Sequence, residues 1–541
     1  MQNKFTELLT GKRELLVLLA VVLLAFGLRC FFLMDYRYPL MLHEQDGIAY
    51  MQIAHDLLHF KPLQTVFMPP FYPVVIALFS LLPVDFELAA RLASVTMDAL
   101  IVLPLYDLVK KLFNKYVSFC VCILWACFSV SLYSSLSPMA FSTYLFFILT
   151  GTSLLYRVLY EDQHVLWLIA SGACFAFAYL TRPEGITGFA IGLIFCVVCS
   201  LRKEGINRKS VKCIALYLAG FVLFAAPYWI FLHNHLGYWT FTGKTAVAIE
   251  GVDGSLILKG GVVGGKGAGG LSLWLDKFGG LTGAVKFVLN NAGGFLTTLR
   301  SQFPAWMGVC ALIGFCFLWV GREFRSRLIL LIPVLVTAPV YIANLPKTPG
   351  YIYPLFPVFF IAFSWCLDRI VFFLKKAAEK CAVIITPVGY QVASGICALV
   401  VLSFIGYDSF TKVAAIFESQ EFLYQVELTI KIFKESGEFV KTVSKPTDLV
   451  MTRWGLISYN AERPYAALPK GNVAEVIEYG RKAGVRFLVI DTISVESRRQ
   501  ELVELLDPLY GKGIDPHYGI MAMRANSYYD LGGYVVYRYI P

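Results

Sequence analysis

Charged residues are scarce in this sequence, and their scarcity decides its broad class. Only 16% of the 541 residues are charged, whereas 57% are hydrophobic. A soluble globular chain has about a quarter of its residues charged, so the composition argues against a soluble protein. Apolar runs of roughly 18 or more residues recur along most of the length, which predicts a polytopic membrane protein.

A continuous basic surface is also missing. The net charge is +10, but the lysines and arginines gather in short segments between the apolar runs and form no stripe with interleaved aromatic residues. Nucleic-acid binding requires such a stripe, so we expect no nucleic-acid partner.

Cysteine is absent from every segment that we expect to be exported. All 13 cysteines lie in or beside apolar runs, which excludes a disulfide framework outside the membrane. Cys120-Val121-Cys122 and Cys196-Val197-Val198-Cys199 have no histidine partners. We interpret them as packing residues rather than metal ligands.

A cleavage site is missing after the first apolar run, so this run is interpreted as an uncleaved span and not a signal peptide. About eleven spans of about 20 residues are expected in all. Their ranges are 14–34, 87–109, 116–134, 138–156, 165–181, 185–201, 211–232, 306–320, 328–345, 351–373 and 383–406.

Lysine and arginine concentrate in alternate loops, for example 110–115 and 202–212. The rule that cytoplasmic loops are positive then predicts a cytoplasmic N-terminus and an exported tail. The weakest loop is 157–164, where Arg157 is offset by two acids. We expect a multi-pass protein of a bacterial inner (plasma) membrane with its C-terminal domain in the periplasm.

Three outer segments follow from this topology: 35–86, the glycine-rich 233–305 and the tail from 412. We expect residues 1–411 to form the membrane domain and 412–541 a small α/β domain. In the tail, residues 418–439 predict an amphipathic helix, 472–483 and 496–506 further helices, and 448–452, 485–491 and 534–539 strands.

A complete phosphate-binding loop is lacking. Gly260 to Gly267 carries glycine where the hydroxyl for Mg²⁺ should stand, and Gly243-Lys244-Thr245 has no glycine at the required spacing before it. Nucleotide binding is therefore not expected. So many glycines favour a mobile loop that becomes ordered when substrate binds.

Acidic residues near a membrane surface are costly and therefore informative. Glu44-Gln45-Asp46 stands just past the first apolar run, at the start of a predicted helix that lies on the membrane. Asp46, Tyr50 and Ala54 share one face of that helix. The functional interpretation is a positioned general base, and the alternative is an interfacial helix whose acids face water.

Two outer turns carry a cation. Arg182 stands in Leu180-Thr181-Arg182-Pro183, and Lys347 in Leu345-Pro346-Lys347-Thr348-Pro349. Each residue either anchors to any lipid phosphate or recognises one specific phosphate, for which a guanidinium offers paired donors.

Together these motifs resemble the GT-C glycosyltransferases that use polyprenyl-phosphate sugars. The protein O-mannosyltransferase-like and lipid A aminoarabinose or galacturonosyl transferase-like members are the most similar. The resemblance rests on the order of Asp46, the Pro69-Pro70-Phe71-Tyr72-Pro73 segment, the Arg182 turn and the Lys347 turn, and is best over 40–190. It implies an all-α polytopic domain with a small exported α/β domain.

The chain departs from the family pattern in specific ways. Gly47 occupies the position of a frequent second acid, the segment 134–143 contains no acid, and no Trp-Trp-Asp signature is present. Glu44 either compensates for the missing acid or pairs with Asp46 around a divalent metal. A metal is not favoured, and no other cofactor is expected.

The implied reaction moves a sugar from its lipid phosphate to a hydroxyl on a lipid, glycan or protein, with inversion. Asp46 would take the hydroxyl proton, and Arg182 and Lys347 would hold the leaving phosphate. Tyr50, His55 and Lys244 are weaker substrate-binding candidates. The alternatives are a lipid-linked glycan ligase or polymerase, or a transporter, although the predicted spans are nearly free of mid-span acids apart from Asp98 and no repeat is visible.

Overall fold

The computed structural model describes residues 11–540, apart from 37, 42–43, 64, 206, 245–278, 319, 321–323, 338–348, 381–386 and 511–518. Contacts between residues divide the chain into two compact units. The membrane unit contains 1–35, 69–231 and 271–415, and the second unit contains 36–68, 232–270 and 416–541. The expected domain boundary at 411/412 stays a prediction.

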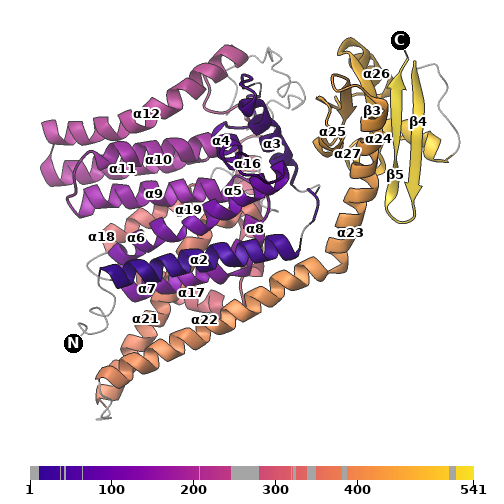
Figure 1. The fold of residues 1–541 in the computed structure, drawn as a ribbon. Helices are drawn as coiled ribbons and strands as arrows, with labels where there is room; N and C mark the ends of the chain where they lie inside the picture. The colour runs from indigo at the N-terminus through magenta and orange to yellow at the C-terminus, as the bar shows by residue number, and fades with distance from the viewer. Residues whose placement is uncertain are drawn as a thin grey trace. The chain divides into compact units, whose positions relative to one another are not determined.

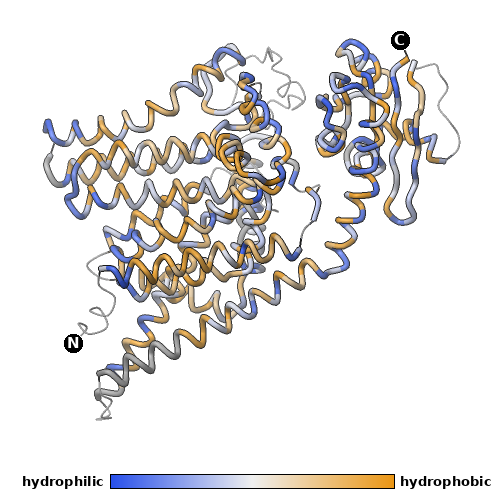
Figure 2. The backbone as a smooth tube through the Cα atoms, viewed as in Figure 1, coloured by the Kyte–Doolittle hydropathy of each residue, from blue (hydrophilic) through white to orange (hydrophobic). Residues whose placement is uncertain are grey.

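The membrane unit consists of helices, most of which run side by side (Figure 1). Figure 2 shows hydrophobic residues along their lengths and hydrophilic ones near their ends. The helices are α2 (Lys12–Asp35), α4 (Phe71–Phe79), α5 (Phe86–Leu100), α6 (Val102–Leu112), α7 (Lys115–Cys127), α8 (Ser129–Ser135), α9 (Phe141–Tyr160), α10 (Trp167–Thr181), α11 (Gly185–Glu204), α12 (Arg208–Leu236), α16 (Leu281–Ser301), α17 (Ala305–Leu318), α18 (Phe324–Arg327), η2 (Leu328–Leu330), α19 (Leu331–Leu335), η3 (Pro349–Leu355), α21 (Phe356–Lys380) and α22 (Pro387–Glu418). The last residues of α12 and α22 belong to the second unit.

Among the described residues, seven helices are long and apolar enough to cross a membrane. The α7–α8 pair, bent by 52°, makes an eighth if it is one span, and α10 and α17 are shorter apolar helices. The chain is therefore an integral, multi-pass membrane protein. Each of these helices overlaps a predicted span, with α5 and α6 counted together over 86–112. The last of the seven, 399–418 in α22, shares only 399–406 with the predicted span 383–406. The predicted span 328–345 runs into residues outside the described part, so the total of about eleven stays a prediction.

Local sequence explains several helix boundaries. Asp85 and Asn114 cap α5 and α7, because their side chains accept hydrogen bonds from the backbone N–H of Leu88 and Val117. Helix α10 ends at Thr181, and the residue after it, Arg182, is extended because Pro183 follows.

Two glycines allow α10 and α12 to approach closely. A Cβ at Gly172 would lie 2.3 Å from the carbonyl oxygen of Tyr217, and one at Gly220 would lie 2.2 Å from that of Ile169. Small residues at such crossings let membrane helices pack backbone against backbone. Any larger side chain at either position would force the two helices apart.

The second unit contains a five-stranded sheet of order β2-β1-β3-β5-β4. Its strands are β1 (Leu449–Thr452), β2 (Tyr465–Ala467), β3 (Val485–Asp491), β4 (Ile520–Tyr528) and β5 (Gly532–Tyr539). β1 runs parallel to β2 and β3, whereas β5 is antiparallel to β3 and β4. The unit's helices are α3 (Gln45–Leu58), α23 (Gln420–Leu428), η4 (Thr429–Lys434), α24 (Glu435–Val443), α25 (Gly455–Ala461), α26 (Val473–Lys482), α27 (Thr492–Arg498) and η5 (Gln500–Tyr510).

Most predicted elements of the tail are confirmed. The strands expected near 448–452, 485–491 and 534–539 are β1, β3 and β5, and α26 begins with a capping box formed by Asn472 and Glu475. The single helix expected over 496–506 is wrong. The chain forms α27 and then the 3₁₀ helix η5, and between them Arg499 donates to the carbonyls of Leu468 and Gly471.

Candidate active site

Glu44 closes the turn that leads into α3. Its side chain is fully buried. One carboxylate oxygen accepts from the backbone N–H of Met41 at 2.9 Å, and the other from the hydroxyl of Tyr38 at 3.4 Å. The backbone N–H of Glu44 donates to the Met41 carbonyl at 2.9 Å. Both oxygens of Glu44 are therefore engaged in holding the loop.

Asp46 stands in the first turn of α3 and is partly exposed. The first turn is the position where the helix dipole stabilises a negative charge. The other members of its helical face, Tyr50 and Ala54, are buried. Tyr50 and Ala54 thus hold α3 in place by packing, and Asp46 is the acid of this face that solvent can reach.

His55 lies towards the other end of α3, nine residues from Asp46 or roughly 13 Å along the helix. Its ring lies 4.3 Å from that of His59. Burial lowers the pKa of His55, and the charge of His59 lowers it further. The adjacent Asp56 pairs with Lys61 at 2.9 Å. Asp56 is therefore a second acid on the same helix with a partner of its own.

Lys244 lies beside the segment that follows α3. Its ammonium stands 5.1 Å from the centre of the Phe67 ring. Gly243 makes this approach possible, because a Cβ there would lie 2.2 Å from the carbonyl oxygen of Val66. Glu44, Asp46, Tyr50, His55 and Lys244 thus belong to the same unit. The predicted loop 260–267 lies outside the described residues.

Arg182 belongs to the membrane unit. It follows the last residue of α10, only 5% exposed, with its guanidinium 4.5 Å from the centre of the Phe141 ring. Its Nη2 donates to Glu184 Oε1 at 3.1 Å. The turn is tight, because a Cβ at Gly185 would lie 2.3 Å from the backbone nitrogen of Tyr179. Lys347, the other predicted cation, lies outside the described residues.

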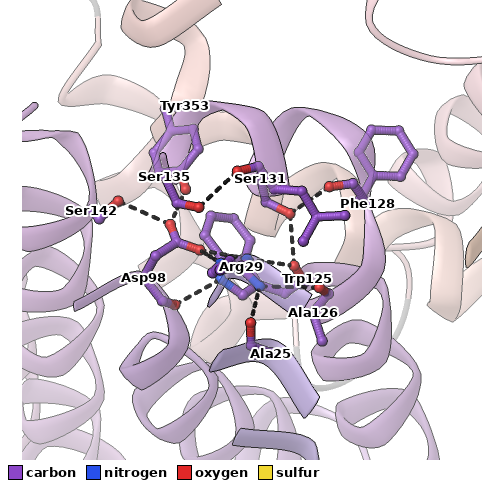
Figure 3. A network of polar contacts seen from close by, with 11 residues as sticks. Ala25, Arg29, Asp98, Trp125, Ala126, Phe128, Ser131, Ser135, Ser142 and Tyr353 are labelled. Carbon is purple, nitrogen blue, oxygen red and sulfur yellow. Dashed lines mark hydrogen bonds and ion pairs between the residues drawn. The ribbon is translucent and has the colours of Figure 1, made fainter. Parts of the chain in front are cut away.

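Arg29 and Asp98 form a buried ion pair in the same unit (Figure 3). Only Asp98 was identified from the sequence. Arg29 Nε donates to Asp98 Oδ1 at 2.7 Å, and both side chains are fully buried. Asp98 also accepts from the hydroxyls of Ser142, at 3.0 Å, and Tyr353. The pair joins α2 and α5 to α9 and η3. The sequence singled out Asp98 because it is an acid in the middle of a predicted span. Arg29 lies six residues before the end of an apolar helix, where an arginine gives no indication of a buried partner.

Arg29 also satisfies the backbone where the chain breaks between α7 and α8. Its guanidinium donates to the carbonyls of Ala126 at 3.1 Å and Trp125 at 3.2 Å, and Ser131 donates to Trp125 at 2.7 Å. Carbonyls released by a break in a membrane helix have no water to bond. The bend of 52° is therefore stabilised by side-chain donors.

Within the described residues, no group of three or more His, Cys, Asp or Glu side chains is arranged to hold a metal ion. Of the two acids predicted as a metal-holding pair, Glu44 already accepts hydrogen bonds at both of its carboxylate oxygens.

Comparison with known proteins extends these observations. The family profile of dolichyl-phosphate-mannose-protein mannosyltransferases matches residues 68–231. The archaeal oligosaccharyltransferase AglB of Archaeoglobus fulgidus, solved with an inhibitory peptide and a dolichol-phosphate, is similar with a TM-score of 0.58 and 16% identity, over 90% of this chain and 70% of AglB. No curated protein sequence matches.

ArnT of Cupriavidus metallidurans, solved with undecaprenyl phosphate bound, is similar with a TM-score of 0.55 and 13% identity over 98% of both chains. At these identities the likeness concerns the fold. The chain has the GT-C glycosyltransferase fold with a small C-terminal sheet domain, which confirms the resemblance predicted from the sequence.

Proposed function

From the GT-C fold we propose that this chain is a membrane glycosyltransferase that transfers a sugar from a polyprenyl-phosphate carrier to an acceptor hydroxyl on the outer face of the membrane. The observation that carries the proposal is the likeness to ArnT over 98% of both chains. Two similar structures hold a polyprenyl phosphate, dolichol-phosphate in AglB and undecaprenyl phosphate in ArnT.

The acceptor hydroxyl is a poor nucleophile and needs a base aligned with it. Asp46 is the acid suited to this role, because it is partly exposed at the start of α3, whereas Glu44 is buried and bonded to Met41 and Tyr38. The acceptor oxygen bonds to C1 of the sugar as its proton passes to Asp46. This division of roles supports a base that acts without a metal.

The leaving group is a lipid phosphate that gains negative charge as the C1–O bond breaks and its electron pair moves to the phosphate oxygen. Cations positioned at that oxygen stabilise the transition state. Arg182, with Lys347 as a second cation, holds the phosphate through paired donors. Direct displacement of this group by the acceptor inverts the anomeric carbon.

The decisive experiment compares cells with and without the gene for this chain. Mass spectrometry of envelope glycolipids, glycans and glycoproteins is expected to show one sugar lost from one class. The purified chain should restore that sugar when supplied with the matching polyprenyl-phosphate donor. An unchanged envelope together with no transfer from any polyprenyl-phosphate sugar would refute the proposal.

A further inference from the structure

The turn that carries Arg182 also holds its own counter-ion. Glu184 stands at the start of α11, two residues after Arg182, and the ion pair between them measures 3.1 Å. The side chains are only 6% and 16% exposed. The negative charge of Glu184 largely neutralises the positive charge of Arg182. The pair as a whole therefore attracts an anion only weakly.

A buried hydroxyl lies beside this pair. Tyr144 is three residues after Phe141, the residue beneath the guanidinium, and residues at that spacing share one face of α9. Arg182 and Glu184 both act electrostatically on Tyr144. The Tyr144 hydroxyl is buried and has no hydrogen-bond partner within the part of the chain that the structure describes.

An unpaired buried hydroxyl is unfavourable, and a ligand that enters the site and accepts a hydrogen bond from Tyr144 would remove that cost. Such a ligand must also compete with the Glu184 carboxylate for the Arg182 guanidinium, so it must itself be anionic. A phosphate meets both conditions, since it offers several oxygens to a guanidinium and a hydroxyl at once.

We propose that Glu184 is an internal competitor for Arg182: the phosphate of a polyprenyl carrier replaces the Glu184 carboxylate on the guanidinium and accepts a hydrogen bond from Tyr144. This inference rests on the proposed function and adds a device for turnover. After transfer the carrier phosphate has lost its sugar and gained charge. The return of Glu184 to Arg182 then helps this product to leave.

The test measures the binding of undecaprenyl phosphate to the purified full-length chain in detergent, without any transfer. Glu184→Gln removes the competitor and keeps the shape, so affinity should rise roughly three- to tenfold. Tyr144→Phe removes one donor to a charged group, and affinity should fall about tenfold. Tyr156→Phe is the matched control, since it lies 12 residues along α9, or roughly 18 Å away, and should bind as the wild type does.

A double-variant cycle shows whether Glu184 acts through Arg182. Glu184→Gln should give no gain in an Arg182→Ala background. If Glu184 merely held the turn in shape, Glu184→Gln would weaken binding, and that result in a folded protein overturns the inference. Equal effects on inorganic phosphate would overturn the assignment to a lipid carrier.

The failure of this inference is separable from that of the proposed function. If the wild type transfers sugar and binds the carrier, but Glu184→Gln binds it no more tightly, the competitor role is refuted and the glycosyltransferase remains. If the wild type binds no polyprenyl phosphate, both are refuted. The uncharged polyprenol of the same length should not distinguish the variants, and a difference there would also refute the competitor role.

Discussion

Glu44 and Asp46 lie two residues apart but differ in burial and in hydrogen bonding. Glu44 is enclosed and accepts from Met41 and Tyr38, whereas Asp46 is partly exposed in the first turn of α3. The sequence identified both acids but could not divide their roles. That division depends on the contacts of Glu44 with Tyr38 and Met41, and residue spacing does not determine them.

For Asp46→Asn, we expect transfer to fall by ~10²–10⁴-fold, the usual range for the loss of a general base. Asparagine keeps the shape and accepts hydrogen bonds but takes no proton. The measurement is initial transfer rate with saturating donor, alongside binding of undecaprenyl phosphate, which should persist. Near-normal transfer by a well-folded Asp46→Asn protein would remove Asp46 from the mechanism.

Asp56→Asn is the matched control, because Asp56 lies on the same helix but pairs with Lys61. It should transfer at close to the wild-type rate. A chelator should not inhibit the wild type if Asp46 acts without a metal. Inhibition that is reversed by added Mg²⁺ or Mn²⁺ would instead indicate that Glu44 and Asp46 hold a metal ion together.

At the scale of elements, the α7–α8 break and the Arg29–Asp98 pair depend on each other. Arg29 bonds to the carbonyls of Trp125 and Ala126 while it neutralises Asp98. Asp98 in turn accepts from Tyr353 in η3. A change in one member therefore reaches α2, α5, α7 and η3 together.

Arg29→Met should destabilise the folded protein by ~3–5 kcal/mol, since it leaves Asp98 buried without its cation. Arg29→Met combined with Asp98→Asn should recover part of the loss, because no uncompensated charge remains. Ser131→Ala, which removes one hydrogen bond to Trp125, should cost only about 1 kcal/mol. Thermal unfolding in detergent measures all three, and a wild-type melting temperature for Arg29→Met would contradict the structural role.

The sheet contains a buried acid with a perturbed titration. Asp491 ends β3, is fully buried, and accepts from the backbone N–H and the hydroxyl of Ser494 at 2.8 and 2.6 Å. Burial raises its pKa from 3.8 to about 6, although the hydrogen bonds from Ser494 oppose the change. The folded state therefore holds the proton more tightly than the unfolded state does.

The contribution of Asp491 to stability is present below about pH 4 and is lost as the pH rises through about 6. Asp491→Asn should therefore gain stability relative to the wild type by roughly 2–3 kcal/mol between pH 4 and pH 7. Hydrogen exchange of the β3 amides in the full-length chain, corrected for intrinsic rates, measures the difference. A difference independent of pH would show that Asp491 titrates normally.

The elements that the sequence predicted are those with a strong local pattern. Val485 to Asp491 is a continuous apolar run, and Asn472 with Glu475 forms a capping box. β4 was missed because Met521, Arg524 and Asn526 show no apolar alternation, and it pairs only with β5 at the edge of the sheet. α16 was missed because it lies in a segment that its glycines made look like a loop.

At the scale of the whole molecule, membrane spans were the most predictable feature, since each needs about 20 apolar residues in one stretch. Contacts between distant residues were not predictable. Arg29 and Asp98 are 69 residues apart, and Tyr353 lies another 255 residues along the chain from Asp98. Nothing in the residues around Arg29 indicates which later helix supplies its partner.

The orientation of the membrane unit can be tested with reporters. Glu14 at the start of α2 pairs with Lys115 at 2.7 Å, so the N-terminal end of α2 and the loop before α7 share one side of the membrane unit. The rule that cytoplasmic loops are positive predicts that this side is cytoplasmic. A fluorescent reporter that folds only in the cytoplasm should stay dark after Pro541, and a periplasmic phosphatase there should be active. The reverse result would invert the predicted orientation.

The Arg29–Asp98 pair also has a consequence for biogenesis. During synthesis α2 emerges before α5, and the acid that neutralises its arginine is made 69 residues later. An arginine within a membrane helix costs about 2.5–3.5 kcal/mol at insertion, which the apolar residues of α2 must offset; an 18-residue window of this helix has a mean hydropathy of 2.7. Until α5 and α7 arrive, the nascent α2 has a cation without its final partners. The order of translation therefore makes α2 a helix that inserts early but docks late.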